Sequence, residues 1–258
     1  MSSELKAPDY LSPSSITTFK QCPLKFKYNK IDLIPDPSNH WAVLGNFVHD
    51  ILEELYKLPS EMRLVETARI IAKDMWEMRW ADEAYKVLAT EKEIKEFRWS
   101  AWWCVENLWR LENPEFVKPE GLEHELNGEA GGVRMRGFID RYSFTEGTTM
   151  LTVSDYKTGK TPKSDIDEKF FQLLVYANLL ASTGVGDVDV IELLYLKDGV
   201  RLTKKVTDED LKKTVEAIQE TKSEIDARCK NGEFEPIKSY LCNFCSYKKI
   251  CPAWSKKW

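Results

Sequence analysis

The sequence feature that most constrains the fold is the stretch Arg136–Lys160, which reads RGFIDRYSFTEGTTMLTVSDYKTGK. Its apolar and β-branched residues predict two short strands joined by a tight turn. A two-residue turn of the primed type at Gly147-Thr148 pairs the residues on either side of it. The resulting register places Asp140 directly opposite Asp155, with Cβ atoms about 4.5–5.5 Å apart.

Lys157 joins these two carboxylates, because side chains two residues apart on a strand share one face and Lys157 therefore lies beside Asp155. Two facing carboxylates destabilise a strand pair, so the arrangement indicates a divalent cation between them. The alternative is an exposed hairpin whose charged side chains face water. The apolar residues around the charges favour the metal site, since buried charges are rarely unpaired; they are Phe138, Ile139, Tyr142, Phe144, Leu151, Val153 and Tyr156.

Two further segments have helical periodicity and carry polar residues at the edge of an apolar face. Residues 45–57 predict an amphipathic helix with His49 beside its apolar stripe, where a structural histidine is the simpler interpretation. Residues 168–182 predict a strongly apolar helix on which Gln172 and Tyr176 lie one turn apart. Buried polar residues need partners. Gln172 and Tyr176 therefore either bond to neighbouring backbone or face the predicted metal site at Asp140 and Asp155.

The segment from about residue 60 to 118 predicts a helical insert that is rich in tryptophan. We interpret these tryptophans as helix-packing core rather than as a base-stacking platform, because aromatic side chains bury large areas. Later segments predict a second hairpin over 189–206 and a polar helix over 208–229 that stops at Asn231-Gly232. Near the beginning, Ser12-Pro13 predicts a helix start.

The chain has 258 residues, a net charge of −5 and six cysteines. This charge excludes nucleic-acid binding by bulk electrostatics, so any such contact must come from a local basic groove. No apolar run reaches about 18 residues, and the first residues do not resemble a secretory signal. We therefore expect no membrane association and a cytoplasmic, reducing location. There is no P-loop pattern that would indicate a motor.

Cysteines in a reducing compartment indicate metal rather than disulfides. Cys242, Cys245 and Cys251 form a C-x2-C-x5-C pattern, which suits zinc or a [4Fe–4S] cluster. The fourth thiolate must then come from a distant part of the chain, and Cys22 and Cys229 are the candidates.

Four motifs in order carry a resemblance to a known family: GNFVHDILE at 45–53, GFIDR at 137–141, DYKTG at 155–159 and Q-x-x-x-Y at 172–176. Together they resemble the RecB-like branch of the PD-(D/E)xK nuclease superfamily. The resemblance implies an α/β fold of the restriction-endonuclease type, a mixed central sheet flanked by helices, in one domain over residues 1–258. The cysteine pattern is similar to that of CRISPR-associated RecB-like exonucleases and the AddB nuclease domain. It implies an iron–sulfur cluster that joins segments 12–28 and 240–252, with zinc as the alternative.

The resemblance also implies roles for individual residues. Asp140, Asp155 and Lys157 are the expected catalytic residues. The expected ligands of Mg²⁺ or Mn²⁺ are His49, Asp140, Asp155 and the backbone carbonyl of Tyr156, and the expected cluster ligands are Cys22, Cys242, Cys245 and Cys251. One more carboxylate is expected from the preceding strand, from Glu123 or Glu125. Gln172, Tyr176, Lys160, Arg136 and Arg141 are the expected DNA contacts, although ordinary surface arginines are the alternative for the last two.

The function implied is a metal-dependent DNA exonuclease acting on strand ends, preferentially single-stranded, in recombination, repair or CRISPR adaptation. Protein partners in such a complex are expected. Two alternatives remain: a nucleic-acid-binding module that does not cleave, and a structural iron–sulfur or zinc subunit of a helicase–nuclease assembly.

Overall fold

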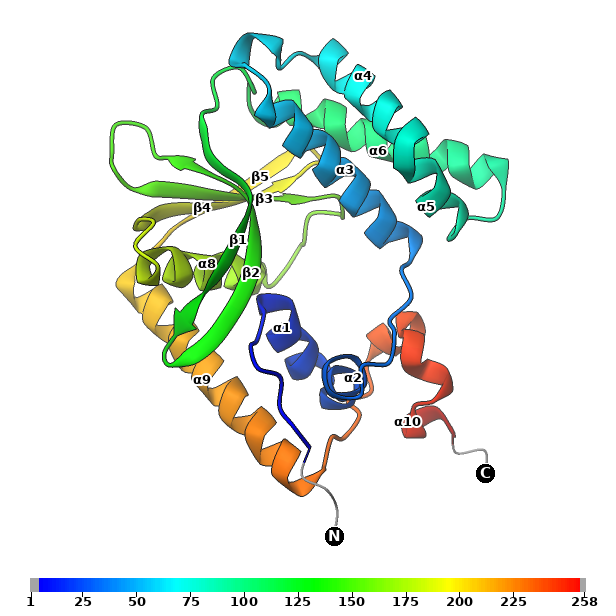
Figure 1. Cartoon of the computed structure of the whole chain (residues 1–258), viewed down its shortest axis with the longest axis vertical. Helices are drawn as coiled ribbons and strands as arrows, with labels where there is room; N and C mark the ends of the chain where they lie inside the picture. The colour runs from blue at the N-terminus through cyan, green and yellow to red at the C-terminus, as the bar shows by residue number, and fades with distance from the viewer. Residues whose placement is uncertain (1–4, 256–258) are drawn as a thin grey trace.

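A five-stranded mixed sheet in the order β1-β2-β3-β4-β5 lies at the centre of the protein. The computed structural model shown in Figure 1 describes residues 5–255. Strands β3 and β4 pair in parallel and all other neighbours are antiparallel, which agrees with the mixed sheet expected from sequence. The strands are β1 (Pro119–Ala130), β2 (Val133–Phe144), β3 (Leu151–Lys157), β4 (Val188–Tyr195) and β5 (Val200–Lys205).

The β2–β3 hairpin has the expected register but a longer loop. Arg141 pairs with Ser154, so Asp140 and Asp155 come next on their strands, as the sequence predicted. The loop nevertheless runs from the end of β2 at Phe144 to the start of β3 at Leu151, and the prediction of a two-residue turn was wrong. The backbone of Thr148 bonds back to the carbonyl of Thr145 instead, closing a turn within the loop. The register survives because this larger loop is centred on the same residues.

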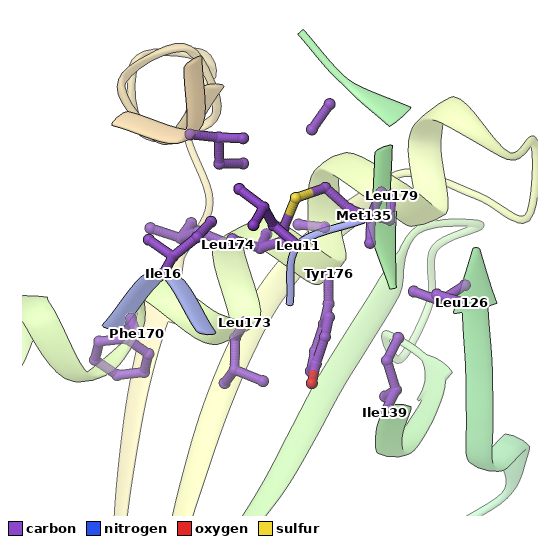
Figure 2. Close-up of a cluster of buried hydrophobic side chains, with 14 of the residues drawn as sticks. Leu11, Ile16, Leu126, Met135, Ile139, Phe170, Leu173, Leu174, Tyr176 and Leu179 are labelled. Carbon is purple, nitrogen blue, oxygen red and sulfur yellow. The ribbon is translucent and has the colours of Figure 1, made fainter. Parts of the chain in front are cut away.

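One face of the sheet is covered by α8 (Phe171–Ser182) and α9 (Asp208–Asn231), with α1 (Pro13–Gln21) against both helices. Figure 2 shows the core between them, where aliphatic side chains of α8 meet Met135 and Ile139 of β2. The helix boundaries follow the sequence signals: Ser12 caps α1 with Pro13 in its first turn, and Gly232 ends α9 with φ of 76°. The short helices α2 (Pro23–Phe26) and α7 (Ile166–Lys169) complete this side.

A second core lies between the sheet and a group of four helices, seen at the upper right of Figure 1. Their apolar faces meet around Phe47, Trp76, Trp80 and Phe97. Tyr156 of β3 contributes to the same cluster, so this core reaches the strand that carries Asp155. The helices are α3 (His40–Lys57), α4 (Val65–Met75), α5 (Ala81–Tyr85) and α6 (Glu91–Leu111).

The C-terminal segment returns to the beginning of the chain. The Tyr247 hydroxyl donates to the carbonyl of Ile34 at 2.9 Å, and the Tyr28 hydroxyl donates to the carbonyl of Ile250 at 3.3 Å. The segment consists of short helical turns, namely the 3-10 helices η4 (Tyr240–Phe244) and η5 (Ser246–Lys249) and the helix α10 (Pro252–Ser255), seen at the lower right of Figure 1. None of the helices in the described part of the chain combines the length and apolar character that crossing a bilayer requires.

Candidate active site

His49, Glu123, Asp140 and Asp155 converge from four elements, namely α3, β1, β2 and β3. Helix α3 buries Val48, Ile51 and Leu52 completely, and this packing turns the neighbouring His49 toward the strands. The sequence placed His49 beside the apolar stripe of this helix. In the structure, that position directs the imidazole ring toward the carboxylates of Asp140 and Glu123.

The distances define a tight cluster around His49. Its Nδ1 lies 3.5 Å from a carboxylate oxygen of Asp140 and 3.9 Å from one of Glu123. Its Nε2 lies 3.0 Å from the carbonyl oxygen of Tyr156. One ligand atom from each of His49, Glu123 and Asp140 lies within 4.8 Å of the other two. Asp140 is held in place by the backbone N–H of Tyr156, which donates to its carboxylate at 2.7 Å.

Asp155 and Lys157 form a buried ion pair next to this cluster. The ammonium of Lys157 lies 2.6 Å from a carboxylate oxygen of Asp155, and the Asp155 side chain is only 3% exposed. The pair confirms the sequence inference that alternate residues of this strand share a face. Asp155 lies outside the group of three whose ligand atoms are closest together, and its carboxylate faces Lys157.

The carboxylates of this site are electrostatically crowded. Burial and the neighbouring Asp140 carboxylate raise the pKa of Asp155 to about 6, although Lys157 partly offsets them. Burial and Asp140 likewise raise the pKa of Glu123 to about 7. Asp140 itself keeps a lowered pKa, because the charged His49 ring and the Tyr156 N–H outweigh the effect of burial. Negative charge is thus concentrated in a small, poorly hydrated volume.

The same crowding acts on the basic residues. Burial disfavours a charged imidazole, but Asp140, Asp155 and Glu123 outweigh it and raise the pKa of His49 to about 9. The pKa of Lys157 is also raised, because Asp155 outweighs burial. A hard divalent cation fits this set of donors, since carboxylate and carbonyl oxygens with one imidazole are ligands that Mg²⁺ and Mn²⁺ accept.

Glu123, and not Glu125, is the acidic residue that β1 brings to the cluster. Glu125 instead forms an exposed ion pair with Arg136 at 2.7 Å. Glu123 has a positive φ of 42°, which a non-glycine residue adopts at a cost in strain. Regular alternation along β1 would treat the two glutamates alike, so the sequence could name both but not choose between them.

Gln172 and Tyr176 bond to each other from successive turns of α8, with the amide of Gln172 donating to the Tyr176 hydroxyl at 3.0 Å. Figure 2 shows the Tyr176 ring extending out of the aliphatic cluster, with its hydroxyl at the far end. A Cβ atom on Gly137 would lie 2.4 Å from this ring. The glycine of GFIDR therefore provides the space for the tyrosine of Q-x-x-x-Y. Burial raises the pKa of Tyr176 to about 12, so the hydroxyl stays protonated.

Arg141, the last residue of GFIDR, and Arg136, which directly precedes this motif, have different environments. Arg141 is 2% exposed, and its guanidinium bonds to Glu112, Ser154 and the Tyr156 hydroxyl. This placement contradicts both expectations for Arg141, a phosphate contact and an ordinary surface arginine, because the side chain is buried and its two terminal nitrogens bond inside the protein. Arg136 remains partly exposed, and Lys160 is exposed in the loop after β3.

Four cysteines are the expected cluster ligands, one from residues 12–28 and three from residues 240–252. All four are half-buried: Cys22, Cys242, Cys245 and Cys251. Among residues 5–255, however, no three of their sulfur atoms lie within 4.8 Å of one another, so the structure forms no closed cysteine site. Cys104 is buried in the helical core, and Cys229 is buried in the core around α8 and α9.

Comparisons with known proteins agree with this geometry. Residues 10–252 match the PD-(D/E)XK nuclease superfamily. The Gene 69 proteins of mycobacteriophages L5 and D29 are 27% and 29% identical over 93% of this chain, covering 95% and 96% of their own lengths. A crystal structure from Eubacterium rectale, named as a putative exonuclease, shares the fold with a TM-score of 0.55 and 18% identity, over 93% of this chain and 88% of that one. The chain belongs to the PD-(D/E)XK nuclease superfamily.

Proposed function

We propose that this protein is a metal-dependent deoxyribonuclease that hydrolyses phosphodiester bonds at DNA ends, preferentially in single strands. The observation that carries the proposal is the meeting of His49, Glu123 and Asp140 within 4.8 Å, with the Asp155–Lys157 ion pair buried beside them. A structural module has no need for so many buried carboxylates, because their mutual repulsion destabilises the fold.

Mg²⁺ or Mn²⁺ would be held by His49, Glu123 and Asp140, with Asp155 and the Tyr156 carbonyl adjacent. When bound, such an ion polarises a phosphate and lowers the pKa of a coordinated water. Lys157 remains an ammonium at neutral pH because its pKa is raised, so its role is to stabilise negative charge that develops on the phosphate.

The remaining residues hold the strand. Tyr176 stays protonated and can donate to a phosphate oxygen, while Gln172 fixes the orientation of its hydroxyl. Arg136 and Lys160 supply positive charge at the exposed edge. Arg141 supports the site differently, because it fixes Tyr156 and thereby the strand between Asp155 and Lys157.

We also propose a [4Fe–4S] cluster that joins the ends of the chain through Cys22, Cys242, Cys245 and Cys251. The Tyr28 hydroxyl donates to the carbonyl of Ile250, and Cys22, Tyr28 and Cys251 pack against the same core, so cysteines distant in sequence lie on one side of the molecule. A tetrahedral zinc site, the alternative, requires sulfurs about 3.8 Å apart, given Zn–S bonds of about 2.3 Å. Each thiolate of a cubane cluster binds a different iron, so such a cluster holds its four sulfurs farther apart than zinc does.

Recombination, repair or CRISPR adaptation are the processes that an end-directed nuclease of this kind would serve, together with protein partners. The exonuclease mode draws support from the family motifs and from the name of the E. rectale protein that shares the fold.

The test is digestion of end-labelled single-stranded, double-stranded and circular DNA with Mn²⁺. Asp155→Ala and Lys157→Ala should each abolish digestion, and circles should resist the wild-type enzyme. Glu123→Gln should lose activity, whereas Glu125→Gln on the same strand should retain it, because only Glu123 reaches the cluster. Equal digestion by wild type and Asp155→Ala would refute the assignment of the site. Tight DNA binding without cleavage would favour the binding-module alternative.

A further inference from the structure

Three tryptophans on the insert side of the molecule are exposed in spite of their size. Trp41 of α3 is 59% exposed, and Trp99 and Trp103 of α6 are 62% and 41% exposed. The sequence interpretation of the insert tryptophans as helix-packing core holds for Trp76 and Trp80, which are buried, but not for Trp99 and Trp103. Exposed tryptophans on neighbouring helices need an explanation other than stability.

The exposed rings surround three adjoining hollows. Trp41, Trp99 and Trp103 all line a hollow of about 220 Å³. Trp99 also lines a second hollow of about 630 Å³ along α6 and a third of about 760 Å³ between α4 and α6. Trp99 therefore stands where the three meet, and they form a continuous surface along the helices. We call this surface, centred on Trp41, Trp99 and Trp103, the tryptophan track.

The tryptophan track begins beside the proposed active site. Thr158, which directly follows Lys157, lines the smallest hollow together with Trp41. Gly45 brings α3 close to Thr158, with its Cβ position 3.5 Å from the threonine hydroxyl. Trp41 and His49 are eight residues apart on α3, or about 12 Å along the helix axis at 1.5 Å per residue. A strand held in the active site would thus reach the first ring of the track.

The tryptophan track is lined mainly by positively charged side chains, whereas the whole chain has a negative net charge. Six cationic and two acidic side chains line the three hollows, although the net charge of the protein is −5. Lys197 lies over the Trp41 ring at 5.5 Å, and Arg110 lies over the Trp103 ring at 5.2 Å. The Trp103 indole N–H donates to the Lys197 carbonyl at 3.0 Å, which fixes that ring in place.

We propose that the tryptophan track binds single-stranded DNA by stacking unpaired bases on its rings, while its cationic side chains contact the backbone. Aromatic side chains interleaved with basic ones are what sequence-independent binding of single strands requires. A duplex cannot use the rings in this way, because its bases are already stacked on one another. The inference rests on the proposed nuclease function and extends it, since it names the surface that selects unpaired strands.

The experiment measures binding of fluorescein-labelled oligo-dT by anisotropy in EDTA, where no cleavage occurs. Trp41→Leu and Trp99→Leu should each weaken binding about fivefold or more, since base stacking on an aromatic ring contributes about 1 kcal/mol at the least. Trp99→Tyr should restore most of the affinity. Phe116→Leu is the matched control, because Phe116 is 81% exposed and lies beyond the C-terminal end of α6. Lys197→Gln should reduce the salt dependence of binding by about one unit of slope.

Two results would overturn the proposal: wild-type affinity for oligo-dT in both leucine variants, or equal losses for a blunt duplex. Circular dichroism of each variant excludes misfolding as the cause of a loss. The binding measurement in EDTA does not depend on cleavage, so it tests the track independently of the nuclease proposal. An error in the nuclease proposal would show separately, as DNA digestion by Asp155→Ala that equals that of the wild type.

Discussion

His49 illustrates how single residues of the site depend on their neighbours. Its pKa is raised to about 9 by three carboxylates that outweigh burial, so the metal-free protein carries an imidazolium in the place where an ion would bind. Glu123, with its pKa raised to about 7, is also partly protonated near neutrality. These protons and a divalent cation compete for the same carboxylate-rich volume.

Metal affinity should therefore rise with pH. His49 must lose its proton to coordinate, so below a pH of about 9 each unit of decrease should weaken Mn²⁺ binding by up to about tenfold for every proton displaced. Calorimetric titration of EDTA-treated protein between pH 6 and 8 measures this dependence, and buffers of different ionisation enthalpy count the released protons. His49→Gln should bind more weakly and with a flatter pH profile. A wild-type affinity that does not change with pH would contradict the assignment of His49 as a ligand.

Arg141 contributes to stability through its buried ion pairs. Arg141 bonds to Glu112 and lies 3.5 Å from Glu192, both of them nearly fully buried. Arg141→Ala should lower the free energy of unfolding by about 3–5 kcal/mol, because it leaves buried carboxylates without their cation. Arg136→Ala on the same strand should cost less than about 1 kcal/mol, since Arg136 forms an exposed pair. Urea unfolding of the two variants makes the comparison, and similar losses would show that Arg141 is not structurally special.

At the scale of elements, the sequence predicted the features that local residue patterns determine, and it missed the features that depend on contacts between distant segments. The register of β2 and β3, the start of α1 and the stop of α9 followed from local patterns. The burial of Arg141 did not, because its partner Glu112 lies at the end of α6 and no spacing in GFIDR reveals it. The choice of Glu123 failed similarly, since its φ of 42° breaks the alternation on which strand reasoning relies.

The contact between β2 and α8 gives a prediction at this scale. Gly137→Ala would place a methyl group 2.4 Å from the Tyr176 ring, so the helix or the strand that carries Asp140 must shift. We expect a loss of about 1–3 kcal/mol in unfolding free energy, as for other overpacked sites, together with reduced cleavage. Gly159→Ala is the control for added volume, because nothing lies within 4 Å of its Cβ position. A double-mutant cycle with Tyr176→Ala should show strong coupling to Gly137→Ala, and additive effects would exclude this contact as the cause.

At the scale of the whole molecule, residues 28–36 contact residues 246–250, away from the group of helices formed by the insert (Figure 1). Among the described residues, the C-terminal segment is held by the buried Tyr247 ring, which packs edge-on against Tyr28 with ring centroids 5.4 Å apart, and by polar contacts. The polar contacts include the Tyr247 bond to Ile34 and the Ser246 bond to Asp36 at 2.6 Å. Exposed side chains dominate this segment, with Tyr240 75% and Phe244 81% exposed. Tyr247 is the one buried side chain among the described residues 240–255, so the segment buries little apolar area, and a ligated cluster would add a constraint.

The cluster proposal predicts that protein purified without oxygen is brown, with absorbance near about 400 nm from thiolate-to-iron charge transfer. Cys22→Ser and Cys251→Ser should each bleach the protein and make residues 233–255 sensitive to limited proteolysis, because the tail then depends on the Tyr247 ring and its polar contacts. Cys229→Ser is the discriminating variant. Cys229 lies on α9 and is buried at 4% exposure in the core, so its loss should leave the colour unchanged. If Cys229→Ser bleaches the protein and Cys22→Ser does not, the fourth ligand is Cys229, and the N-terminal segment is held by its side-chain contacts instead. A colourless protein that contains one zinc ion per chain would require the four sulfurs to move closer together than they lie in this structure.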